Sequence, residues 1–298
     1  IGPPVDDVSD SFDQYWNSPE AIPMAAFDRM VAHSRVTESV EEARKYVDQH
    51  SDTAFLKGVD GRLIEDLIAG RLELVSADAE VVQDGPEQVR NLIRREASAT
   101  SVYLQKMVSA ATEEVIVISP YFVPQQQGVD FFGALVKKGV RIVIITNSLA
   151  STNHSSVHAV YARYRKPLLR RGVELYELRP RSEAMETETK LTLHSKVATV
   201  DKHKLFVGSF NLDPRSLYLN TEMGMAVTSP VLAGRMANSI LDSLPDSSYK
   251  LRLSKKGKLQ WLLQTAGVEE IITTEPQSSL WRRFLTKLMS FLPIEGQM

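Results

Sequence analysis

The sequence predicts an α/β fold in which helices cover both faces of a mixed central sheet. Short runs rich in Val and Ile alternate with segments of helical periodicity, which indicates a β-α-β-α-β order. The runs are continuously apolar, as is typical of strands buried on both faces. The expected strands are 114–119, 140–146 and 173–178, and the helices between them are 129–138 and 156–171. A further strand, 191–200, is expected to join the same sheet.

Elements outside this core follow from turn and helix signals. A long helix is expected over 88–113, after the turn Asp84-Gly85-Pro86. Helices are also expected over 6–16 and 232–241, and each follows a similar short segment, 1–5 and 227–231. This similarity indicates an internal repeat.

Composition excludes several classes of protein. The chain has 298 residues, of which 43% are hydrophobic, so it can bury one large core or two smaller ones. It has no cysteine, so it forms neither disulfides nor thiolate metal sites, which is consistent with a cytosolic compartment. A net charge of −2 argues against a nucleic-acid partner. No apolar run is long enough to predict a membrane span.

One hairpin concentrates side chains suited to phosphodiester chemistry. It contains His194-x-Lys196-x4-Asp201. It continues into Gly208-Ser209-x-Asn211-x3-Arg215-Ser216. Strand alternation places His194 and Lys196 on one face and Asp201 on the other. An imidazole can attack phosphorus or protonate a leaving alkoxide, and an ammonium binds non-bridging oxygens. The alternative is a buried strand whose His and Lys are incidental.

This spacing resembles the signature of the phospholipase D superfamily, which implies a phospholipase D-like α/β/α sandwich. The resemblance implies that Glu222 orients the catalytic histidine, and that Lys196, Ser209 and Asn211 bind the phosphate. It implies that His194 is the general acid/base, while a second motif supplies the nucleophile. The catalytic block is His194, Lys196, Asp201 and Glu222, although we expect Asp201 to act structurally, with Arg215 as its ion-pair partner.

The wider chain is similar to bacterial cardiolipin synthases of the ClsC type. The segments that carry this similarity are 119–124, 146–150, 164–169 and 291–295. The resemblance implies a phosphatidyltransferase that makes cardiolipin from phosphatidylglycerol-type donors through a phosphatidyl-histidine intermediate. It implies no metal or nucleotide cofactor. It also implies a location in the bacterial cytoplasm, peripheral at the inner membrane, with phospholipid as the substrate.

The chain contains one copy of a motif that such enzymes carry twice. The sequence does not start with Met, so we expect residues before Ile1, including the first motif. We therefore expect 1–85 to be the trailing part of a first half with a connecting segment, and 86–298 to be the second domain. The missing half is then a partner of this chain, which on its own is expected to be inactive.

The C-terminal segment 279–292 predicts an amphipathic helix on an anionic membrane. Large apolar residues recur at helical spacing, and basic residues occupy the other faces. The predicted membrane contacts are Trp281, Arg282, Arg283, Phe284, Lys287, Leu288 and Phe291. Packing of this helix against the domain is the alternative.

Other functions stay open at this point. The same acid/base pair would serve a phospholipase D-type phosphodiesterase that hydrolyses phospholipid. A nuclease that pairs single motifs across a homodimer would use a basic helix, and this chain has one at 163–171 beside two tyrosines. A folded but inert fragment is the third possibility. His154 and His158 have metal-ligand spacing but no third ligand nearby, so no metal is predicted.

Overall fold

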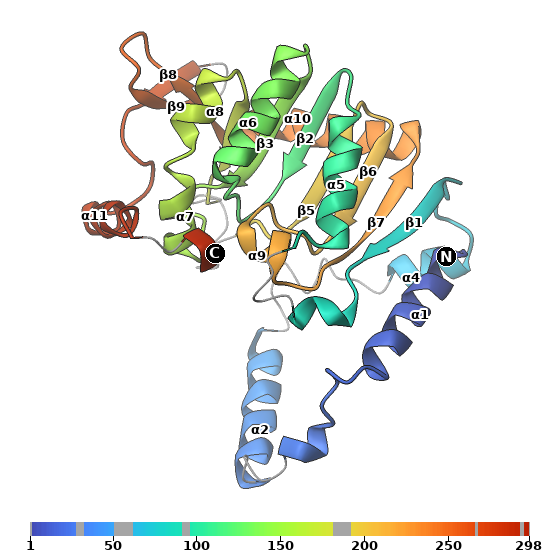
Figure 1. Ribbon diagram of the computed structural model, residues 1–298. Helices are drawn as coiled ribbons and strands as arrows, with labels where there is room; N and C mark the ends of the chain where they lie inside the picture. Colours follow the sequence, from blue (N-terminus) through green and yellow to red (C-terminus); the bar gives the residue numbers. More distant parts are fainter. Residues whose placement is uncertain are drawn as a thin grey trace. The chain divides into compact units, whose positions relative to one another are not determined.

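The computed structural model describes residues 2–27, 33–50, 62–90, 96–180, 192–265, 268–292 and 295–297 (Figure 1). The chain forms two compact units. The larger consists of Ile1–Tyr15 and Ala77–Met298, and the smaller is Trp16–Ser76. No helix among the described residues is both long and apolar enough to cross a bilayer.

A ten-stranded sheet forms the centre of the larger unit, in the order β1-β7-β6-β5-β2-β3-β4-β8-β9-β10. The β2-β3-β4 pairs are parallel and the other pairs are antiparallel, so the predicted mixed sheet is confirmed. The strands are β1 (Asp78–Gln83), β2 (Glu114–Ile118), β3 (Arg141–Asn147), β4 (Glu174–Leu178), β5 (Lys196–Val200), β6 (Lys204–Gly208), β7 (Met223–Thr228), β8 (Ser248–Leu253), β9 (Leu259–Thr265) and β10 (Val268–Ile272).

Helices cover both faces of this sheet, as expected for an α/β/α sandwich (Figure 1). One apolar core lies under α5 (Ala99–Ser109), α6 (Gln125–Lys137) and α8 (Arg165–Arg170). The second core lies under α10 (Pro230–Ser247), which packs small and branched residues against the opposite face. Strand β3 is buried between the two cores, which explains its unbroken run of Val and Ile.

The remaining elements are shorter. In the larger unit they are α1 (Pro4–Trp16), η2 (Pro86–Arg90), α7 (Ser155–Tyr161), α9 (Pro214–Tyr218), α11 (Leu280–Met289) and η3 (Glu295–Gln297). The smaller unit contains η1 (Met24–Phe27), α2 (His33–His50) and α4 (Arg62–Ile68). Most described side chains of α2 are exposed, including Val36, Val40 and Tyr46.

Three sequence predictions about local structure were wrong. No continuous helix spans 88–113: Ser98 caps a separate helix, α5, by accepting a hydrogen bond from the Ser101 N–H. The helix expected over 156–171 is interrupted between α7 and α8. The motif strand begins at Lys196 rather than at residue 191.

The structure also moves the expected boundary at residue 85. Strand β1 pairs along its whole length with β7, so it belongs to the large unit. The Tyr15 hydroxyl donates a hydrogen bond to the Asp84 carbonyl at 2.8 Å, which places the end of α1 in that unit as well. The first 85 residues are therefore divided between both units.

Candidate active site

An open groove of about 500 Å³ lies where β5 begins and β6 ends. The antiparallel register pairs Lys196 with Gly208, so Ser209 directly follows the partner of Lys196. The groove brings together five residues that the sequence proposed for the site, and their chemical roles are addressed under Proposed function. The lining residues are Val89, His194, Lys196, Ser209, Asn211, Leu219, Asn220, Thr221 and Glu222.

The imidazole of His194 is presented to the groove without a hydrogen bond from any described residue. His194 precedes β5, and its side chain is exposed. Its ring lies edge-on to Tyr121, with 6.5 Å between the centroids. An imidazole in this setting is accessible to a ligand as both a base and an acid.

Lys196 is buried beside this histidine and has an altered pKa. Its ammonium donates a hydrogen bond to the His194 carbonyl at 2.8 Å. Burial lowers the pKa of Lys196, and the nearby carboxylates of Glu222 and Asp213 partly oppose that shift. An anionic ligand beside Lys196 would therefore stabilise the charged form of this ammonium.

Glu222 binds other side chains of the groove and not the predicted partner, His194. Its buried carboxylate accepts hydrogen bonds from the Ser209 hydroxyl, from Ser216 at 2.8 Å and from the Asn220 amide at 3.0 Å. None of the described hydrogen bonds joins Glu222 to His194. The structure therefore shows no direct bond for the predicted orientation of the imidazole by Glu222, whose carboxylate binds hydroxyl and amide donors instead.

Asn211 has unused hydrogen-bonding capacity in the groove. Its backbone N–H donates to the Ser216 hydroxyl at 3.2 Å, so the chain of bonds from Glu222 through Ser216 fixes its position. Its side-chain carbonyl oxygen is buried and has no partner among the described residues. Buried polar atoms are rarely left unpaired, so the amide is placed to bind a ligand.

The sequence analysis did not identify Asp84, which binds the backbone of Glu222 in the groove. The two oxygens of its buried carboxylate accept hydrogen bonds from the backbone N–H groups of Thr100 and Glu222, at 2.8 and 2.9 Å. The turn signal at Asp84-Gly85-Pro86 was visible in the sequence. Glu222 lies 138 residues further along the chain, so no local pattern connects the two residues.

Asp201 does not line the groove. It follows β5 at the other end of the strand, where its backbone is left-handed, with a φ of 51°. Its carboxylate accepts hydrogen bonds from Thr112, Glu113 and Glu114, at 2.8 to 2.9 Å. Burial raises the pKa of Asp201, but these donors outweigh burial and lower it overall. Arg215 is not among its partners, so the predicted ion pair is wrong.

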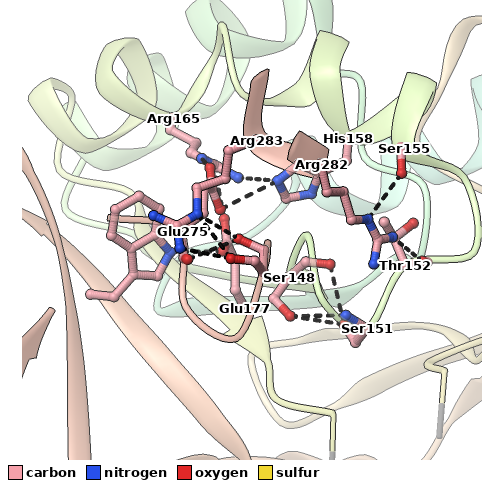
Figure 2. Close-up of polar contacts among 12 residues, drawn as sticks. Ser148, Ser151, Thr152, Ser155, His158, Arg165, Glu177, Glu275, Arg282 and Arg283 are labelled. Atoms are coloured by element: carbon pink, nitrogen blue, oxygen red, sulfur yellow. Dashed lines mark hydrogen bonds and ion pairs between the residues drawn. The ribbon is translucent and has the colours of Figure 1, made fainter. Parts of the chain in front are cut away.

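The basic cluster expected from 163–171 is only partly a free surface, because Lys166 and Arg170 are exposed whereas Arg163 and Arg165 bind other segments. Arg165 is buried and forms ion pairs with Glu177 and Glu275 (Figure 2). Arg163 donates to the Ser290 and Leu292 carbonyls. The described part of the chain has no group of three or more His, Asp or Glu side chains that could hold a metal ion.

Comparisons with known proteins find similar sequences. Residues 104–244 match the family model described as "Cardiolipin synthase, PLD-like domain". The chain is 36% identical to cardiolipin synthase C of Escherichia coli over 99% of this chain, and it spans 64% of that protein. It is 27% identical to an uncharacterized Helicobacter pylori protein, of which it spans 57%.

A solved structure shares the fold. Phosphatidylserine synthase of Haemophilus influenzae superimposes with a TM-score of 0.51 at 12% sequence identity. The match covers 96% of this chain and 58% of that protein. Identity this low supports the likeness of fold alone.

Replacing Asp201 is expected to lower stability rather than to disable the groove. Asp201→Ala removes the acceptor for four hydrogen bonds and places Ala in a left-handed conformation, which together cost about 2 kcal/mol at pH 7. Because the folded pKa of Asp201 is lowered, the stabilisation exists above its unfolded pKa and disappears as the pH falls. Urea unfolding between pH 3 and 7 measures this difference, and equal stability at pH 7 would contradict it.

Asp213 is expected to show the opposite pH dependence. It caps α9 by accepting from the Ser216 N–H, and burial, assisted by Glu222, raises its pKa to about 6. Its stabilising effect is therefore complete below its unfolded pKa and is lost as the pH rises through 6. Asp213→Asn keeps a good cap. The free energy of unfolding of this variant, relative to that of the parent chain, should increase by about 2 kcal/mol between pH 4 and 7, as measured by urea unfolding. A pH-independent difference would contradict the prediction.

Proposed function

We propose that this chain, whose residues 104–244 match a PLD-like domain, forms part of a phosphatidyltransferase of the phospholipase D superfamily that makes cardiolipin from phosphatidylglycerol-type donors. The observation that carries this proposal is the groove in which an unbonded imidazole, a buried ammonium and an unpaired amide converge. The similarity to a cardiolipin synthase over 99% of the chain supports the choice of substrate class.

The proposed reaction gives each of these groups a role in both half-reactions. The nucleophilic histidine of a second motif attacks phosphorus, and the bond between phosphorus and the leaving alkoxide breaks. His194 gives its proton to that alkoxide, and the phosphatidyl group stays on the other histidine. His194 then takes the proton of the acceptor hydroxyl as that oxygen attacks phosphorus and displaces the histidine. Both half-reactions proceed without a metal or nucleotide.

Lys196 and Asn211 would stabilise the negative charge on the phosphoryl oxygens during both steps. The ammonium supplies a point charge, and the side-chain NH₂ group of Asn211, rather than its unpaired carbonyl oxygen, supplies a directional donor. Glu222 would act through Ser209 and Ser216, because its carboxylate binds both hydroxyls. The proposal therefore makes Glu222 a positioning residue for the phosphate-binding groups.

The proposed enzyme is peripheral at the inner membrane, on the cytoplasmic side, and α11 would contact the lipid. Four predicted contacts are exposed apolar side chains on this helix or just after it: Trp281, Phe284, Leu288 and Phe291. Arg282 instead points toward the domain, where it donates to the Thr152 carbonyl at 2.9 Å and to the Ser155 hydroxyl (Figure 2). The helix thus docks through a polar face and leaves an apolar face outward.

The first functional test is His194→Ala in the enzyme that contains this chain. Loss of the general acid should lower transfer from phosphatidylglycerol vesicles about 10²- to 10⁴-fold, because the alkoxide then leaves unprotonated. His203→Ala is the matched control, since His203 lies exposed in the β5–β6 turn and should leave the rate unchanged. Cardiolipin formation, followed by lipid mass spectrometry, measures both. Wild-type rates for His194→Ala would reject the assignment.

The membrane contact predicts binding that depends on apolar side chains more than on charge. Phe284→Asp combined with Leu288→Asp should reduce partitioning onto phosphatidylglycerol-containing vesicles at least 100-fold, because two large apolar side chains no longer insert. Lys287→Gln, on the same helix, should change it about fivefold or less. Vesicle co-sedimentation at 0.1 and 0.5 M salt measures both. Binding that is abolished by salt, or unchanged in the double variant, would contradict the prediction.

A further inference from the structure

A second cavity, of about 380 Å³, lies between the sheet and the two helices α5 and α6. Its walls are mainly apolar. Leu104 and Val108 of α5, Phe131 and Phe132 of α6, and Phe206 and Phe210 from β6 and the loop after it contribute large side chains. Such a volume falls in the range of small-molecule sites. The proposed chemistry does not use this cavity.

Three segments form a wall between this cavity and the catalytic groove. Lys196 lines both spaces. In the second segment, Phe210 and Leu212 line the cavity while Asn211, between them, lines the groove. In the third segment, 217–218 line the cavity and 219–220 line the groove. The two spaces are therefore immediate neighbours along the whole of this wall.

The two serines in the cavity wall already use their hydroxyls in hydrogen bonds within the protein. The Ser119 hydroxyl donates to the Tyr121 carbonyl and accepts from the Leu212 N–H. The Ser101 hydroxyl donates to the Ser98 carbonyl. Gln105 and Gln127 are exposed, so they mark the opening to solvent. A nucleoside or sugar would lose hydrogen bonds on entering, whereas a hydrocarbon chain would not.

We infer that this cavity binds one acyl chain of the phospholipid whose phosphate lies in the groove. The inference rests on the proposed function for the phosphate end of the ligand. In a phospholipid only a glycerol unit separates the phosphate from the acyl ester, and this short separation suits two spaces that both have Lys196 in their lining. Lys196 suits the boundary, because a lysine combines an apolar stem with a cationic head. A helix of a partner protein, about 10 Å wide, is too large for the cavity.

The test measures binding of lysophosphatidylglycerols of increasing chain length to residues 1–298, below their critical micelle concentrations. Affinity should rise about fourfold for each added methylene until the cavity is full, because each buried methylene contributes a fixed increment. Displacement of a fluorescent fatty acid reports the affinity. Glycerophosphoglycerol, which has no acyl chain, should not displace the probe.

Leu104→Trp fills the cavity from a partly exposed position and should lower affinity for the long-chain ligands at least tenfold. Val102→Trp is the matched control, because Val102 lies on the same helix, is 52% exposed and does not line the cavity. Both measurements are repeated with Phe284→Asp and Leu288→Asp in the background, so that binding to α11 is excluded. Thermal unfolding confirms that each variant is folded.

Photocrosslinking needs no variant and provides a second measurement. A fatty acid with a terminal diazirine should label peptides of α5 and α6, as identified by mass spectrometry. Affinity independent of chain length, equal binding by both Trp variants, or labelling confined to α11 would overturn the inference. If His194→Ala leaves transfer intact while the Leu104→Trp effect persists, the proposed reaction fails and the acyl site stands.

Discussion

The buried carboxylate of Glu222 is the constraint on which the groove depends. Removing a carboxylate from water costs several kcal/mol unless charge-assisted hydrogen bonds replace the lost solvation. Here three side-chain donors do so, and they come from the loop after β6, from α9 and from the residues before β7. Asp84 binds the backbone N–H of the same residue. Segments that the sheet alone would leave loose are thereby held at fixed positions around Lys196.

A second buried carboxylate cluster has a structural role in the part of the sheet formed by β4, β8 and β9. Arg165 bridges Glu177 and Glu275, and the Trp261 indole donates to Glu177 at 2.8 Å (Figure 2). Burial raises the pKa of Glu275, but Arg165 and His158 outweigh it and hold that pKa well below its usual range. Removing one member of such a cluster leaves an uncompensated buried charge. The segment that precedes α11 is therefore fixed to β4, α8 and β9.

The sequence predicted those elements that are encoded by a contiguous apolar run or a contiguous motif. Strands β2 and β3 were predictable because each is mainly a Val/Ile run, and the β5–β6 hairpin because its motif is contiguous. Strands β8 and β9 escaped prediction, since their apolar residues are interspersed with Lys, Arg and Gln. The partners of Glu222 and Asp201 escaped for a different reason. Both carboxylates bind groups in loops and caps, and no periodicity shows which loop folds back onto which side chain.

The register of β6 and β7 determines which side chains line the apolar cavity and which line the groove. Gly208 and Gly224 are paired across β6 and β7, and a Cβ on Gly224 would lie 2.2 Å from the Phe206 ring. This close approach admits no side chain at Gly224, so it fixes how Phe206 packs and how the chain continues from β6. Downstream, alternation sends Phe210 into the apolar cavity and Asn211 into the groove. A slip of one residue would exchange them, placing an amide among aromatic rings and a phenyl group where the phosphate is proposed to bind. Gly208 and Gly224 therefore protect the chemistry indirectly, because their close packing favours this register of β6 and β7.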